Sequence, residues 1–168
     1  NEGTASTDYS ITPVNGTLTV TKSSKAITIE SASHSKMYDG SKLTAPTYTV
    51  KYGNETITAD EGSDGLVFTL PTKDKLTITD TSNVVHVADT KDNNNTFDFV
   101  LQNANQYETV TPTYGTLTIT VRNVTLTSGS HTREYDGTPL TVNTVSVSGD
   151  GFATGEGATY NVTGSQNS

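Results

Sequence analysis

Hydrophobic and polar residues alternate over short stretches that recur along the whole chain. A period of two places every second side chain on one face of a β-strand, so each stretch predicts a strand with one buried face. Turn residues such as Asp-Gly and Gly-Asn separate the stretches. The predicted strands cover residues 17–21, 26–30, 47–51, 66–70, 76–79, 96–100, 116–121, 124–127 and 142–148.

The same pattern predicts an all-β fold. No stretch carries an apolar stripe at helical spacing, and the best helical candidate, residues 101–107, is short and rich in Asn and indicates a turn. Residues 52–60 look like an additional hairpin within the central part of the chain. The connections are too short for helical crossovers, which favours antiparallel pairing. We therefore expect small, elongated antiparallel modules.

The chain also repeats itself. Residues 26–44 recur as residues 123–141 at a spacing of 97, and the Gly-Thr-Leu-Thr motif at 16–19 recurs at 115–118 at a spacing of 99. Such a period is typical of modular arrays and argues against a unique catalytic site. It divides the chain into closing strands of a preceding unit (1–22), a complete central unit (23–121) and the first part of a following unit (122–168).

Short junctions join these units, and a short linker cannot bend freely. We therefore expect neighbouring units to stack into a stiff rod. The central unit should have its own core, drawn from its alternating apolar positions. The expected core residues are Ile27, Ile29, Leu43, Tyr48, Val50, Leu66, Phe68, Ile78, Phe97, Phe99, Leu117 and Ile119.

Composition narrows the function. Only 31% of the 168 residues are apolar, whereas 34 are Thr and 16 are Ser, which suits sheets that are half exposed to water. The net charge of −8 argues against a nucleic-acid partner. The absence of Cys excludes disulfides and thiolate chemistry. No apolar run approaches the length of a membrane span, so we expect no membrane insertion of this segment.

One set of candidate functional residues recurs with the repeat. An exposed Tyr beside a carboxylate could stack on a sugar. Alternatively, Asp-Gly forms the turn after the first strand, and Tyr packs at the edge of the core while its hydroxyl bonds to the backbone. Recurrence in both copies favours the structural interpretation. The residues are His34, Tyr38, Asp39 and Gly40 in the central unit, and His131, Tyr135, Asp136 and Gly137 in the following one.

Neither a catalytic nor a cofactor site is predicted. A catalytic histidine needs a partner acid and a cleft, and the Ser-rich bends around the repeated histidines indicate surface positions instead. His86 is expected to face solvent from a strand. Asp89, Asp92 and Asn94 are a weak calcium candidate, because calcium prefers oxygen ligands. Their spacing is not that of a known calcium loop and Lys91 lies among them, so a solvated loop is favoured.

The recurring motif K/R-x-Tyr-Asp-Gly, followed by Leu-Thr, resembles the YDG-type repeats of long, cell-wall-anchored surface proteins of gut Firmicutes and related bacteria. Its most specific parts are Tyr-Asp-Gly-Thr-Pro-Leu-Thr at 135–141 and the Gly-Thr-Leu-Thr strand. The resemblance implies an extracellular, adhesin-type stalk without catalytic residues. It also implies a small Ig-like β-sandwich, with a β-grasp-like sheet as the alternative, and mucin binding in some related modules.

Together these observations predict a non-enzymatic repeat module on the bacterial cell surface that serves as the stalk of an adhesin. The alternative is a binding module for mucin-type glycans or a host surface protein. The expected partners are neighbouring repeats of the same polypeptide. Because both outer parts look like incomplete units, we also expect head-to-tail association between chains, with residues 9–21 docking on residues 123–168.

Overall fold

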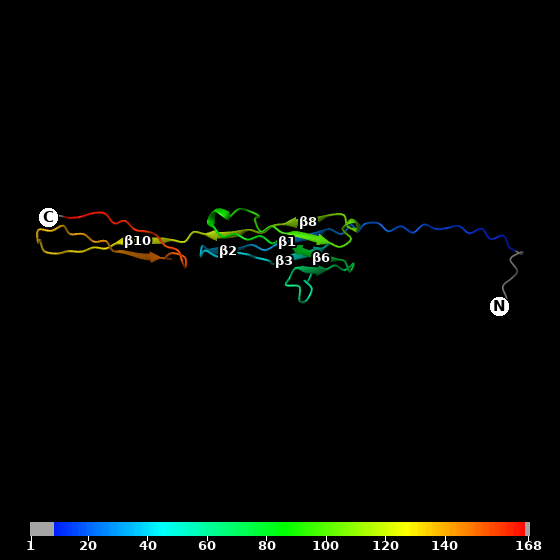
Figure 1. Cartoon of the computed structure of the whole chain (residues 1–168). Helices are drawn as coiled ribbons and strands as arrows, with labels where there is room; N and C mark the ends of the chain where they lie inside the picture. The colour runs from blue at the N-terminus through cyan, green and yellow to red at the C-terminus, as the bar shows by residue number, and fades with distance from the viewer. Residues whose placement is uncertain (1–8, 167–168) are drawn as a thin grey trace.

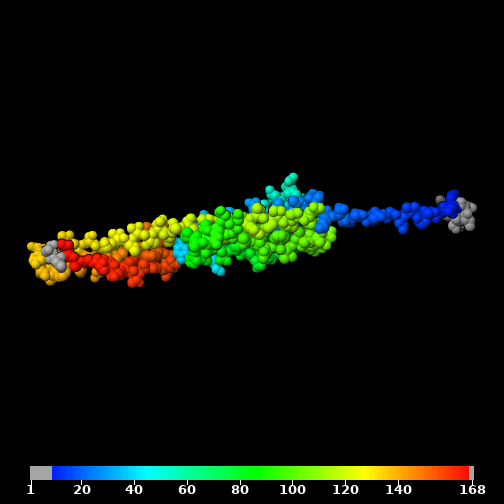
Figure 2. Space-filling model, turned by 90° about the horizontal axis from the view of Figure 1, so that it is seen from above, coloured from blue at the N-terminus to red at the C-terminus, as the bar shows by residue number. Residues whose placement is uncertain are grey.

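The computed structural model describes residues 9–166, and the structural statements below concern those residues. The all-β class is confirmed: within residues 9–166, the only helices are two short 3-10 turns, η2 (Val87–Asp89) and η3 (Ala104–Gln106). The units follow one another along a single long axis, with residues 9–22 projecting from one end and the β10 region forming the other (Figure 1). Figure 2 shows the same narrow outline from above.

In the described part of the chain, eleven strands form four small sheets. The strands of the central unit are β1 (Ile27–Ser31), β2 (His34–Met37), β3 (Tyr48–Tyr52), β4 (Glu55–Ile57), β5 (Val67–Thr69), β6 (Lys75–Thr79), β7 (Asp98–Leu101), β8 (Val110–Thr113) and β9 (Leu117–Thr120). The last unit contributes β10 (Val124–Ser128) and β11 (Val145–Gly149).

The central unit is consistent with a small β-sandwich. One sheet has the order β4-β3-β1-β8, a second has the order β5-β6-β7, and β2 pairs with β9 beyond them. Apolar side chains from the first two sheets pack into one buried cluster that includes Ile29, Val50 and Ile78. A hairpin is present near the predicted range of 52–60 but begins earlier: β3 and β4 form it across residues 48–57, and Val50 pairs with Ile57. The predicted turn at 101–107 contains η3.

Strand direction differs from the expectation in two places. Five of the seven strand pairings in the described residues are antiparallel, but β1 pairs with β8 and β2 pairs with β9 in parallel. After β2 the chain forms β3 to β7, and then β8 and β9 lie alongside β1 and β2. The crossover that parallel strands require is therefore made of strands and loops in place of a helix.

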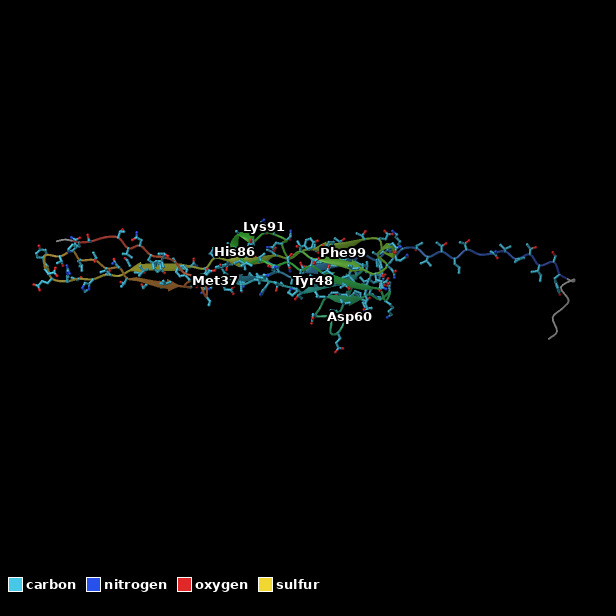
Figure 3. The ribbon with its side chains drawn as sticks, in the orientation of Figure 1. Met37, Tyr48, Asp60, His86, Lys91 and Phe99 are labelled. Atoms are coloured by element: carbon cyan, nitrogen blue, oxygen red, sulfur yellow. The ribbon has the colours of Figure 1, made fainter. Side chains whose placement is uncertain are left out.

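The core largely follows the predicted positions. Ten of the twelve predicted residues are buried, and Leu66 and Phe99 are half-buried against the main cluster. A smaller cluster of Leu43, Val84, Leu117 and Ile119 lies between β9 and the loops beside it. Figure 3 places Tyr48 and Phe99 within the body of the central unit, while Asp60 lies on a loop that projects from it.

The strand predicted at residues 17–21 is wrong. Residues 9–22 are exposed along their whole length, and no strand pairs with them in the described part of the chain. Leu18 is 100% exposed and Val20 is 91% exposed. In the central unit the equivalent strands, β8 and β9, pair with β1 and β2. Among the described residues, no strand lies beside residues 9–21 in the same way.

Candidate functional site

The Tyr-Asp-Gly motif of the central unit forms a tight, hydrogen-bonded turn directly after β2. Asp39 Oδ1 accepts hydrogen bonds from the Ser41 amide at 2.9 Å and the Ser41 hydroxyl at 2.8 Å, and Lys36 Nζ lies 2.7 Å away. Gly40 has φ +79°, a conformation that glycine adopts without strain. The Lys36 ammonium and the Ser41 donors hold the pKa of Asp39 well below its usual range.

The second copy builds the same turn with different residues. Asp136 Oδ1 accepts from the Thr138 amide at 2.9 Å and the Thr138 hydroxyl at 2.7 Å, and Arg133 Nη2 lies 3.0 Å away. Gly137 has φ +80°. Hydrogen bonds from Thr138 lower the pKa of Asp136. Because Lys–Ser and Arg–Thr perform the same task in the two copies, the geometry supports a structural role for the Asp-Gly pair.

The two tyrosines of the motif are in different environments. Tyr38 is half-buried, stacks on the His86 ring at 5.9 Å between centroids, and donates a hydrogen bond to Glu156 Oε1 at 2.5 Å. That hydrogen bond raises the pKa of the Tyr38 hydroxyl. Tyr135 is 76% exposed. The hydroxyl of Tyr38 thus contacts a carboxylate of the next unit, where sequence analysis expected a backbone partner.

Tyr38 and Glu156 belong to a contact between the two units, which we call the joint. The Arg122 side chain lies at its centre, donating from Nε to the Gly151 carbonyl at 2.7 Å and from Nη2 to the Asp150 carbonyl at 2.6 Å. Its Nη1 donates a longer hydrogen bond of 3.4 Å to the Tyr38 carbonyl. Figure 3 shows His86 and Met37 at this end of the central unit, toward β10. The joint therefore fastens the Tyr-Asp-Gly turn of one unit to the following unit.

Most residues of the joint leave no local pattern in the sequence. Arg122 was visible only as a basic residue between two strands, and its repeat equivalent is Lys25. Asp150 and Glu156 lie in a Gly-rich loop about thirty residues away in sequence, and no local pattern links them to Arg122. The signal that could have found the joint is the basic residue retained at equivalent positions of both junctions.

The histidines lie on the surface. His34 is exposed on β2 and His131 is exposed before the second turn. His86 is also exposed, but it caps η2 and does not belong to a strand, so the predicted strand position is wrong. Its ring covers Tyr38, which makes it a neighbour of the joint.

The weak calcium candidate is largely occupied by backbone contacts. Asp89 Oδ2 accepts from the amides of Val85 at 3.1 Å and His86 at 2.8 Å. Asn94 Nδ2 donates to the Leu117 carbonyl at 2.9 Å, and Asn94 Oδ1 accepts from the Leu117 amide. Asp92 is exposed nearby. Within residues 9–166, no group of three or more His, Asp or Glu side chains could hold a metal ion.

Three surface hollows lie on the last unit. One of about 100 Å³ is lined by residues that include Tyr135, Asp136 and Leu140. Two wider grooves of about 420 and 530 Å³ run beside β10 and are bordered by residues 159–166.

Among the described helices, none has the length and apolar character needed to cross a membrane.

Known proteins offer no further guide to this arrangement. No family model matches the chain, and neither the curated proteins nor the solved structures yield a significant match.

Proposed function

We propose that this chain is a non-catalytic spacer: a series of repeat units that holds another part of a bacterial surface protein at a distance from the cell. The observation that supports this proposal is the joint between the central and last units. A spacer needs neighbouring units in a fixed relation, and two hydrogen bonds cross the boundary between the central and last units: from Tyr38 to Glu156, and from Arg122 to the Tyr38 carbonyl. Arg122 also donates to the Gly151 and Asp150 carbonyls of its own unit, which holds that loop beside the boundary.

The shape and the repeated turn support the same function. The units lie end to end, so that each one adds to the length of the molecule (Figure 1). The turn that contributes Tyr38 to the joint is rebuilt at Tyr135, at the far end of the last unit. A further unit could be fastened there in the same way, which is the property that an extensible rod requires.

Distance measurements between the two units test the proposal. The chain has no Cys, so spin labels can be attached at Thr49→Cys on β3 and Ser146→Cys on β11. We expect a narrow distribution of label-to-label distances by double electron–electron resonance. Arg122→Ala removes the hydrogen bond to the Tyr38 carbonyl and the two that hold the loop at Asp150 and Gly151, and should broaden that distribution.

Lys51→Ala is the matched control, because Lys51 is an exposed basic residue on β3, outside the joint. It should leave the distribution narrow. A wild-type distribution as broad as that of Arg122→Ala would mean that the units hinge independently, and the spacer proposal would then lose its support.

A second candidate function is the binding of mucin-type glycans. One observation favours it: Tyr135 is 76% exposed beside Asp136 and borders a hollow of about 100 Å³. An aromatic face next to a carboxylate suits a sugar ring. A glycan array should then show binding that Tyr135→Ala abolishes and Tyr160→Ala, a change of another exposed Tyr, preserves. Absence of binding would leave the spacer as the remaining proposal.

A further inference from the structure

The exposed segment of residues 9–21 carries the side chains of a core strand. Leu18 and Val20 are 100% and 91% exposed, whereas Leu117 and Ile119, at the same places in the Gly-Thr-Leu-Thr motif, are 0% and 1% exposed. Ile11 is 80% exposed. A row of large apolar residues in an extended chain is the usual form of a strand that lacks its sheet.

The last unit presents an edge at which such a strand would fit. β10 pairs with β11 on one side, in the register that joins β1 to β3: Leu126 lies opposite Val147, as Ile29 lies opposite Val50. The other side of β1 is covered by β8. The corresponding side of β10 has no strand partner in the described residues. A groove of about 530 Å³ is lined by Leu126 and Ser128 of β10, Val145 of β11 and residues 159–163, so this strand pair is incompletely covered.

We propose that residues 9–21 of one molecule add to this edge of a second molecule as its missing parallel strands. The central unit supplies the register. Ile27 pairs with Val110 and His34 pairs with Leu117, so the repeat spacings of 97 and 99 place Ile11 opposite Val124 and Leu18 opposite His131. Strand addition of this kind gains main-chain hydrogen bonds and buries alternate side chains.

Two serines that receive the strand in the central unit recur in the last one. The Ser31 hydroxyl accepts a hydrogen bond from the Gly115 amide, and the Ser33 hydroxyl accepts one from the Thr116 amide, each at 2.9 Å. Their equivalents are Ser128 and Ser130. The acceptors for the amides of Gly16 and Thr17 are therefore in place on the last unit.

The proposed contact requires a glycine at position 16, because the two backbones approach closely there. A Cβ on Gly115 would lie 2.4 Å from the Ala32 carbonyl oxygen and 2.6 Å from that of Ser31, so the two backbones touch there. Gly16 holds the same place in the exposed segment and has no atom within 4 Å of a Cβ in the isolated molecule. After docking, its Cα would face the carbonyls of Ser128 and Gly129.

Residues 9–21 would reach this edge from a second copy of the chain. Residues 9–21 and the β10–β11 hairpin lie at opposite ends of the long axis, with the whole central unit between them (Figure 1). A molecule therefore cannot reach its own edge. Contact between two different surfaces does not close on itself, so the expected product is an open chain of molecules.

Light scattering after size-exclusion chromatography tests the association with the full chain. The mass should rise above 17.8 kDa in steps as the protein concentration increases. Gly16→Val should return the mass to that of the monomer without lowering its melting temperature, because the side chain meets nothing in the isolated molecule. Gly157→Val is the control, since its Cβ also meets nothing and its position lies outside the proposed pairs.

Cysteine pairs test the register separately. Thr118 pairs with Ser35, so the proposal places Thr19 opposite Thr132. Mixing Thr19→Cys with Thr132→Cys under oxidising conditions should yield a disulfide-linked dimer, whereas Thr19→Cys with Thr127→Cys should not. A monomer at all concentrations, unchanged association of Gly16→Val, or equal crosslinking of both pairs would overturn the proposal.

Discussion

The central and last units contain equivalent strand pairs, β1–β3 and β10–β11, but the residues packed around the two pairs differ. Ile29 and Val50 are fully buried between two sheets, while their equivalents Leu126 and Val147 are 47% and 43% exposed. The backbone hydrogen bonds are nevertheless alike: the Ala32 amide donates to the Thr47 carbonyl at 2.9 Å, as Gly129 does to Thr144 at 2.8 Å.

The comparison shows that two strands can pair without forming a buried core. The two strands keep the same register in both units, with Ile29 opposite Val50 and Leu126 opposite Val147. Burial requires other segments to cover the sheet, and in the central unit these are β8, β9 and the β5-β6-β7 sheet. The last unit has the aligned pair and lacks that cover in the described residues.

The largest expected effect comes from shortening an apolar side chain on the shared strand. Ile29→Ala should destabilise the protein by about 2–5 kcal/mol, since it leaves a cavity in a closed core. Leu126→Ala should cost at most about 1 kcal/mol, because nearly half of that side chain already contacts water. Chemical denaturation of both variants at low protein concentration measures the difference, and equal losses would contradict it.

A somewhat smaller effect is expected at Asn95, a buried polar residue of the central unit. Its Nδ2 donates to the carbonyls of Ala32 at 2.7 Å and Ala45 at 3.0 Å, which joins the β7–β9 side of the unit to its first strands. Asn95→Ala leaves both carbonyls without this donor and should cost about 1–3 kcal/mol. A thermal melt measures it. Asn161→Ala, on the exposed surface of the last unit, should leave the melting temperature nearly unchanged.

Acid should weaken both units in the same way, because both contain the Asp-centred turn. The pKa values of Asp39 and Asp136 are lowered in the folded state. Their stabilisation is therefore present above the ordinary carboxyl pKa of about 4 and is lost as the pH falls below it. Unfolding measured from pH 6 to pH 2 should show a smaller pH dependence for Asp39→Asn than for the wild type. Superimposable profiles would argue against the turn.

The smallest effect is expected at the joint in alkali. The pKa of Tyr38 is raised by its hydrogen bond to Glu156, so the contribution of that bond is present below the ordinary tyrosine pKa of about 10. It is lost as the pH rises through the folded-state value. An NMR titration of the Tyr38 ring should move to lower pH in Glu156→Gln. An unchanged midpoint would mean that the two side chains do not meet in solution.

Several features were predictable because they depend on nearby residues. Eight of the nine predicted strands are present within a few residues of the expected bounds. Two strands were not predicted. β2 (His34–Met37) has no alternation of apolar and polar residues. β8 (Val110–Thr113) contains Pro112, which a strand tolerates here because β8 lies at the edge of its sheet. The predicted role of Asp39 and Gly40 as a turn agrees with their geometry, whereas the contact between Tyr38 and Glu156 spans 118 positions and left no local pattern.

By itself, the sequence determined the all-β class, the repeat and the positions of most strands, since alternation and turn chemistry act between neighbours in the chain. Only the tertiary structure decided the parallel return of β8 and β9, the joint around Arg122, and the exposure of Leu18 where Leu117 is buried. Those features depend on which segments meet in space. The same Gly-Thr-Leu-Thr motif is a core strand where β2 lies beside it and an exposed, extended segment where nothing does.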